Sequence, residues 1–147
     1  MNARLPQIPL RLNATLREAV RLGEMSIAME VVRLSPIFSR ARAKAIGVAF
    51  RLARTTADFR LLHEFTDPGS RMEHRVVRKW AHTAKTGREL VEVLSIVRGL
   101  EKSERLERYL LRKLKPLGYR DWWKPILDNL RAVRRLLRPL LHSRKLA

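Results

Sequence analysis

Residues 40–54 read RARAKAIGVAFRLAR and predict a helix with two chemically different sides. Alanine recurs at every fourth position, and small side chains in such a row let a second helix pack closely. The alanines are Ala41, Ala45, Ala49 and Ala53. At about 3.6 residues per turn, the other side carries four basic residues: Arg40, Lys44, Arg51 and Arg54. We therefore expect a packing seam on one side of this helix and an anion-binding surface on the other.

Two long helices are predicted in the first half of the chain. The second would run over residues 36–64. The first would begin at Asn13 or at Thr15, which could form a capping box with Glu18, and would end near Leu34. Its apolar residues fall on two roughly opposite sides, so we expect it to be buried from both sides, within the domain or against another subunit.

The rest of the chain is also predicted to be helical. The turn residues at 67–70 favour an antiparallel return of the chain, and Thr86 with Glu89 forms another capping box. The predicted helices cover about 71–85, 86–97, 103–115 and 121–137, the last capped by Asp121. The pattern predicts an all-α protein in which long antiparallel helices form a bundle, without an internal repeat.

The helix at 103–115 is predicted to have a self-neutralised solvent face. Acidic and basic side chains alternate there at i,i+4-like spacing. They are Glu101, Glu104 and Glu107 with Arg105, Arg108 and Arg112. We assign no function to this face.

The N-terminal segment has a different character. Pro6 and Pro9 oppose a helix and favour extended backbone, so we expect residues 1–12 to form an extended arm. Residues 13–147 are expected to form a single helical domain, because a chain of this length is typical of one domain. The arm and the doubly apolar first helix together predict a protein built to assemble with other subunits.

The charge of the chain indicates a polyanionic partner. There are 32 Lys and Arg against 14 Asp and Glu, a net charge of +18, and a charge of this size favours binding to nucleic acid. Of the cations 24 are Arg, whose planar guanidinium can donate two hydrogen bonds to one phosphate. The side-chain amides that read adenine edges are limited to three Asn and one Gln. Binding should therefore depend little on base sequence.

The last predicted helix has the same two-sided pattern as residues 40–54. Its apolar side is formed by Ile126, Leu130, Val133 and Leu137. Its other side carries four arginines and no acid: Arg131, Arg134, Arg135 and Arg138. We predict that these arginines, like the basic residues of 40–54, bind nucleic acid. Because Trp122 and Trp123 precede this helix, contact with a membrane surface is an alternative.

Residues that would support catalysis or metal binding are not grouped in the sequence. The chain has no Cys and four scattered His, so we expect no metal site. It lacks phosphate-binding glycine loops and nucleophile motifs, and we expect neither a cofactor nor enzymatic activity. One pair, Arg75 and His82, resembles the spaced arginine and histidine of the HEPN ribonucleases, which are also all-helical. That resemblance implies activation of an RNA 2′-hydroxyl by the pair.

The extended arm, the helices apolar on two sides, the arginine-rich faces and the missing catalytic set together resemble the major capsid proteins of filamentous viruses of hyperthermophilic archaea. The resemblance covers the general architecture of the whole chain and no individual motif. It implies a structural protein of the virion that polymerises around double-stranded DNA. Its further partners would be copies of itself or a paralogous subunit in a helical assembly.

Other protein classes fit the same pattern. A small helical ribosomal or mitoribosomal protein would share the charge, the arm and the lack of catalysis, with rRNA in place of DNA. A HEPN-like ribonuclease and a subunit of a membrane complex are further alternatives. The sequence contains no apolar run of the ~18 residues needed to cross a bilayer, so membrane contact would be limited to the surface.

Overall fold

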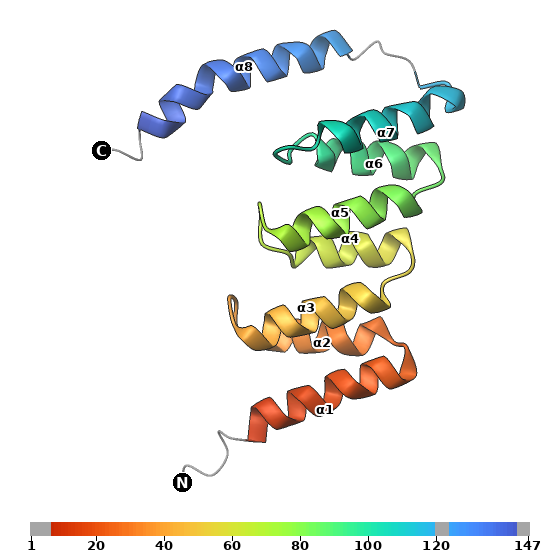
Figure 1. Cartoon of the computed structure of the whole chain (residues 1–147), viewed down its shortest axis with the longest axis vertical. Helices are drawn as coiled ribbons and strands as arrows, with labels where there is room; N and C mark the ends of the chain where they lie inside the picture. The colour runs from red at the N-terminus through yellow and green to blue at the C-terminus, as the bar shows by residue number, and fades with distance from the viewer. Residues whose placement is uncertain (1–6, 120–123, 144–147) are drawn as a thin grey trace.

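A computed structural model describes residues 7–119 and 124–143, with side chains for 11–119 and 129–138. Within these ranges the chain forms eight α-helices, one 3₁₀ turn and no strand (Figure 1). This confirms the predicted all-α class. The elements are α1 (Gln7–Leu22), α2 (Met25–Leu34), α3 (Arg40–Leu52), α4 (Thr56–Glu64), α5 (Arg71–Thr83), α6 (Gly87–Val97), α7 (Glu104–Leu114), η1 (Lys115–Leu117) and α8 (Lys124–Ser143).

The helices stack as pairs along the long axis of the molecule (Figure 1). α2 and α3, α4 and α5, and α6 and α7 each form a hairpin, in which the second helix runs back along the first. α1 packs on α2 and α3 just as α5 packs on α6 and α7. α1 therefore occupies the position that the second helix of a preceding hairpin would have. We call α1, α3, α5 and α7 the odd layer, and α2, α4 and α6 the even layer. This is the arrangement of an α-solenoid, whereas we had expected a bundle of long helices.

The three hairpins are copies of one structural unit. The N-caps of the even-layer helices lie 31 residues apart, at Glu24, Thr55 and Thr86. A serine is the N-cap of each odd-layer helix after α1: Ser39, Ser70 and Ser103. The first two of these helices also end at matching extended C-caps, Ala53 and Ala84. The units therefore begin at residues 24, 55 and 86.

The residue before each of these serines has a left-handed backbone. The angle φ is +64° at Phe38, +78° at Gly69 and +54° at Lys102. Our prediction that the chain has no internal repeat was therefore wrong. The features that recur are caps, turn conformations and burial, whereas the side chains at most repeated positions differ.

The core lies between the two layers. Ala45 and Ala49 of α3 have no exposed surface, and α2 packs on this helix. The predicted alanine seam is therefore confirmed at its centre. Trp80 stands at the place in α5 that Ala49 has in α3, and it is 1% exposed. Successive units thus fill equivalent core positions with side chains of very different volume.

The predicted helix from Thr15 to Leu34 is divided into α1 and α2. Gly23 ends α1 with φ +70°, a left-handed conformation that glycine adopts without a Cβ clash. Thr15 lies inside α1, where its hydroxyl donates a hydrogen bond to the carbonyl of Arg11 at 2.9 Å. The predicted capping box of Thr15 with Glu18 was therefore wrong. The predicted end of the helical region at Leu34 is confirmed.

The prediction of an extended arm over residues 1–12 was wrong for its second half. α1 begins at Gln7, so residues 7–12 are helical. Pro9 falls in the first turn of α1, where the absent N–H would have no helical acceptor. The remainder of the predicted arm, residues 1–6, lies outside the described residues.

The predicted helix over residues 36–64 is broken by a capping box that we did not predict. The hydroxyl of Thr55 accepts a hydrogen bond from the N–H of Asp58 at 3.2 Å, and the Asp58 carboxylate accepts one from the N–H of Thr55 at 2.9 Å. A capped N-terminus therefore begins α4 at Thr56. Burial raises the pKa of Asp58, but the hydrogen bonds from Arg54 and Thr55 outweigh it and lower the pKa below its ordinary value.

The later helices follow the predictions closely. α5, α6 and α7 begin and end within about two residues of the predicted positions, and the capping box of Thr86 and Glu89 is present. α8 continues past its predicted end near residue 137, through Pro139, to Ser143. The predicted cap at Asp121 lies outside the described residues.

Substitution of a buried alanine tests the packing of α3. Ala49→Leu should lower the free energy of unfolding by about 1–3 kcal/mol, because added methyl groups overpack a closed site. Ala43→Leu is the matched control, since Ala43 is exposed on the same helix, and it should melt like the wild type. Circular dichroism during urea unfolding measures both. Equal stability of the two variants would show that α3 does not pack through Ala49.

Acid should weaken the helix caps. The pKa of Glu89 is lowered by hydrogen bonds from the N–H groups of Lys85 and Thr86, as that of Asp58 is by its own capping contacts. A lowered folded-state pKa contributes stability above the unfolded value, and this is lost as pH falls through the folded value. The free energy of unfolding should therefore fall between about pH 5 and about pH 3. A double variant, Asp58→Asn with Glu89→Gln, should show a smaller fall in urea titrations. Identical pH profiles would contradict the prediction.

Candidate nucleic-acid interface

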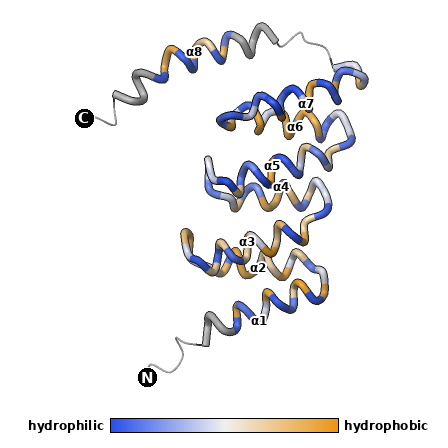
Figure 2. The backbone as a smooth tube through the Cα atoms, viewed as in Figure 1, coloured by the Kyte–Doolittle hydropathy of each residue, from blue (hydrophilic) through white to orange (hydrophobic). Residues whose placement is uncertain are grey.

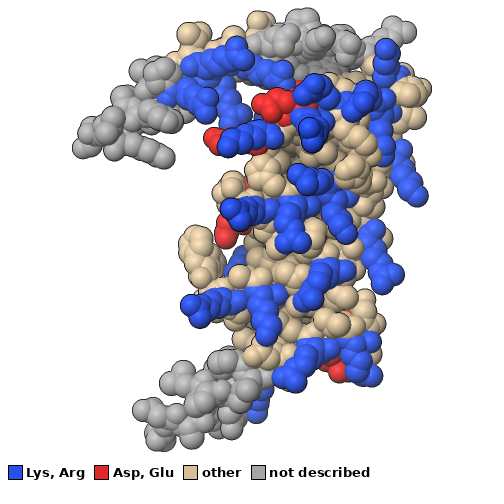
Figure 3. Space-filling model, in the orientation of Figure 1, with Lys and Arg blue, Asp and Glu red and all other residues tan. Residues whose placement is uncertain are grey.

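Charge is sorted between the two layers of the stack. α3, α5 and α7 together contain 12 Lys and Arg and three acidic residues, whereas α2, α4 and α6 contain three Arg and five acidic residues. Figure 3 shows that Lys and Arg side chains gather across successive levels of one face of the molecule. The odd layer is therefore the strongly basic side of the protein.

Two of the three acidic residues of α3, α5 and α7 are turned inward. The side chain of Glu73 is 11% exposed and accepts hydrogen bonds from His63 Nε2 at 3.1 Å and from the N–H of Gly69 at 2.6 Å. The Glu107 side chain is 12% exposed and pairs with Arg98 of the α6–α7 connection and with Arg131 of α8. Neither carboxylate neutralises the exposed cations of its own helix.

This placement corrects our prediction for the helix at 103–115. Glu104 is the one exposed acid on α7, and the Glu107 carboxylate binds arginines of other segments. Within the described residues no ion pair forms between an acid and Arg105, Arg108 or Arg112. Glu101 and Glu104 are exposed, but the predicted ion pairs of this face are absent among the described residues.

The predicted basic residues of 40–54 are all exposed, and three of them lie on α3. Arg40, Lys44 and Arg51 share one side of this helix. Lys44 Nζ donates a hydrogen bond to Asn13 Oδ1 of α1 at 2.7 Å. Arg54 lies beyond the end of α3, and its backbone N–H donates to Asp58. The predicted stripe is thus three residues on a helix and one in the following connection.

A second basic stripe, which we did not predict as such, covers the exposed side of α5. It recurs at helical spacing and includes no acid, because Glu73 faces inward. Its members are Arg71, Arg75, Arg78, Lys79 and His82. The signal was present in the sequence RMEHRVVRKWAHT as a basic side opposite a narrow apolar one. Of these residues we had interpreted only Arg75 and His82, as a HEPN-like pair.

Aromatic rings connect the exposed sides of α3, α5 and α7. Phe50 of α3 lies beneath Arg75 and Lys79 of α5, with the Cζ of Arg75 4.9 Å and the Nζ of Lys79 5.6 Å from the ring centroid. The rings of His82 on α5 and Tyr109 on α7 lie 4.6 Å apart. These cation–π and ring contacts make the three sides one continuous surface, which we call the basic face. Its cations are Arg40, Lys44, Arg51, Arg71, Arg75, Arg78, Lys79, Arg105, Arg108 and Arg112.

Arg75 and His82, the HEPN-like pair, lie two turns apart on the same side of α5 and contact different aromatic rings. Arg75 contacts Phe50, whereas His82 contacts Tyr109. Arg75 thus contacts α3 and His82 contacts α7, and both contacts belong to the basic face.

α8 presents its two predicted sides to solvent. The four arginines Arg131, Arg134, Arg135 and Arg138 are exposed, and Arg131 is bound to the Glu107 carboxylate at 2.6 Å. The apolar residues on the other side are also uncovered. Leu130 is 58% exposed, Val133 49% and Leu137 47%. Ile126, Trp122 and Trp123 lie outside the described side chains.

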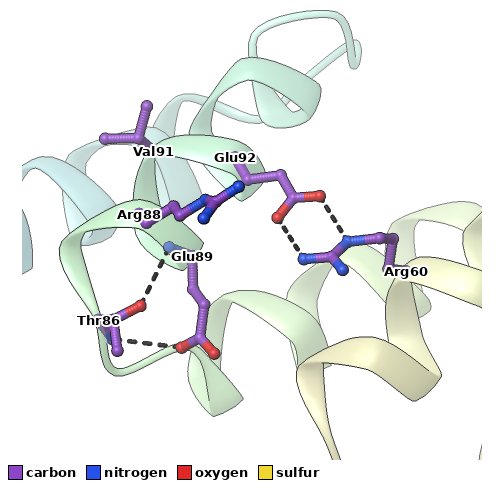
Figure 4. Close-up of a pocket in the computed structure, with 6 residues that line it drawn as sticks. All are labelled: Arg60, Thr86, Arg88, Glu89, Val91 and Glu92. Atoms are coloured by element: carbon purple, nitrogen blue, oxygen red, sulfur yellow. Dashed lines mark hydrogen bonds and ion pairs between the residues drawn. The ribbon is translucent and has the colours of Figure 1, made fainter.

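An open groove of about 740 Å³ on the even layer has no free catalytic carboxylate (Figure 4). Glu92 forms two hydrogen bonds of 2.6 Å with Arg60, which raise the pKa of the arginine. Glu89 is held in the cap of α6. Among the described residues there is no cluster of three His or acidic side chains that could bind a metal. No described helix is both long enough and apolar enough to cross a bilayer.

Comparison of the chain with models of protein families, with curated proteins and with solved structures found no match. The interpretation of the basic face therefore depends on its chemistry.

Two arginines on opposite layers test whether the basic face binds polyanions. Arg78 of the basic face and Arg88 of the even layer are both exposed, so Arg78→Gln and Arg88→Gln remove the same charge from opposite sides. Arg78→Gln should reduce the slope of log K against log salt by about 0.9, the value for one phosphate contact on a duplex. Arg88→Gln should leave that slope unchanged. Fluorescence anisotropy with a labelled duplex over a salt series measures both, and equal effects would show that binding follows net charge alone.

Proposed function

We propose that this protein binds double-stranded nucleic acid through the basic face, without preference for base sequence. The observation that carries the proposal is the separation of charge between the layers, which puts ten exposed cations on one surface with a single exposed acid among them on α7. Contacts of lysine and arginine with phosphates provide affinity that is independent of sequence.

The two aromatic rings within the basic face, Phe50 and Tyr109, are not platforms on which the bases of a single strand could stack. Proteins that bind single strands use open aromatic rings on which bases stack. Here Phe50 is only 7% exposed and lies beneath two cations, and Tyr109 is covered by His82 and Lys113. These rings hold cations in place and do not offer a free surface to bases. Backbone binding fits this arrangement better than base stacking.

The more specific form of the proposal is a coat protein that assembles along duplex DNA. The resemblance to the capsid proteins of filamentous archaeal viruses implies this role, with other copies of the chain as partners and the virion as its location. It is supported by the uncovered apolar side of α8, because such a side is normally buried against another subunit. The charge of +18 opposes contact between free copies, so assembly should depend on the nucleic acid.

Sedimentation with and without a duplex tests the assembly. A ~30-base-pair DNA should bind several copies of the wild type cooperatively, whereas the protein alone should stay in small species. Leu137→Glu should bind as separate copies, because it places a charge in the apolar side of α8. Ala132→Glu is the matched control, since Ala132 lies on the same helix between the apolar and the basic sides.

Identical binding curves for the wild type and Leu137→Glu would contradict self-association through α8. An RNA duplex of the same length separates the proposal from the ribosomal alternative. Tighter binding to RNA than to DNA would favour rRNA as the partner.

A further inference from the structure

The end of α2 and the loop that joins it to α3 present three apolar side chains to solvent. Leu34 is 76% exposed, Ile37 66% and Phe38 86%. Phe38 is the most exposed large apolar residue of the described chain. The loop projects at the edge of the stack, at the start of α3 (Figure 1), and its tip is hydrophobic (Figure 2). An aromatic ring in this position contributes little to the core.

The turn itself does not require a phenylalanine. Phe38 has a left-handed backbone, with φ +64°, and the equivalent residue of the second unit is Gly69, with φ +78°. Glycine adopts this conformation readily, whereas a side chain strains it. Ser39 and Ser70 cap the following helices in the same way, each accepting a hydrogen bond from the N–H three residues on. The third unit has Lys102 at this position, with φ +54°, so the turn accepts different residues and does not account for an exposed aromatic ring.

The position of the ring next to the basic face indicates its partner. Arg40, the first cation of that face, lies two residues after Phe38, and Lys44 follows one turn later. A polyanion bound to these cations would pass beside the loop tip. The nearest acid on α2, Glu30, is already paired with Arg33, so it would not repel the phosphates strongly. Charge complementarity thus favours nucleic acid as the partner of this apolar tip.

We infer that Phe38 is a wedge that inserts between adjacent base pairs of the bound duplex, with Ile37 beside it. The inference rests on the proposed function. Apolar side chains that enter a base step unstack it and kink the duplex, while cations beside them hold the backbone. The wedge adds a deformation of the duplex to a surface that otherwise binds only phosphates. It would give the protein a preference for unpaired steps, whatever the base sequence, without any hydrogen bond to a base edge.

Fluorescence of 2-aminopurine, which rises when the base is unstacked, tests the wedge. The probe is a duplex with 2-aminopurine beside one unpaired base, and dyes on its two ends report bending by energy transfer. The wild type should raise the fluorescence, bend the duplex, and bind this probe on the order of tenfold more tightly than a fully paired one, because less stacking is lost. Phe38→Ala and Phe38→Gly should lose all three effects and keep the salt slope of the wild type.

The controls separate the wedge from the fold and from the proposed function. Phe38→Gly should melt no lower than the wild type, since glycine relieves the left-handed strain, and Val91→Ala changes an exposed apolar residue of the even layer and should behave as the wild type. An unchanged 2-aminopurine signal on wild-type binding, with the salt slope intact, would overturn the wedge alone. Absence of any duplex binding would overturn the proposed function as well. If Phe38→Ala instead abolishes self-association seen without DNA, the loop binds protein and the wedge is wrong.

Discussion

The capping boxes at Thr55 and Thr86 turn the chain from the odd layer back to the even layer, and the rest of the structure depends on them. The apolar and basic periodicity of residues 36–64 would allow one long helix. A threonine and a carboxylate three residues later satisfy N–H groups that only a helix start leaves free, so they stabilise a new helix at that point. The following helix then lies in the other layer. Two layers, and the core between them, follow from these turns.

The same alternation decides where the charge lies. Basic residues are spread along most of the sequence, but every second helix of the stack turns its exposed side in the same direction. The inward acids Glu73 and Glu107 fix neighbouring segments and leave the surface cations without local counter-ions. A chain that repels itself strongly is thereby given one surface where a polyanion relieves the repulsion. The fold and the proposed binding activity therefore have a common origin in the order of the helices.

The sequence was sufficient to predict the helical class, the bounds of α5, α6 and α7 and the exposure of the α3 and α8 arginines. Those features depend on local periodicity and on caps of Thr with Glu. It did not reveal the repeat, because Ala49 and Trp80 fill equivalent places with different volumes and only caps and turns recur. The box of Thr55 and Asp58 was present in the sequence, but the basic stripe of residues 40–54 runs up to it and favoured one continuous helix. Contacts such as Phe50 with Arg75 join separate helices, and no local pattern predicts them.

The repeat leaves the number of hairpins in the stack open to change. Each hairpin makes its main contacts with the helices just before and after it, so the fold does not set the number of hairpins. A duplicated copy of residues 55–85 would begin with the same threonine N-cap and end with the same alanine C-cap as its neighbours. It would add one more odd-layer helix with four cations. Gain or loss of one unit during evolution would therefore change the length of the basic face, and with it the length of nucleic acid that the proposed function would have one chain cover, without any new side-chain chemistry.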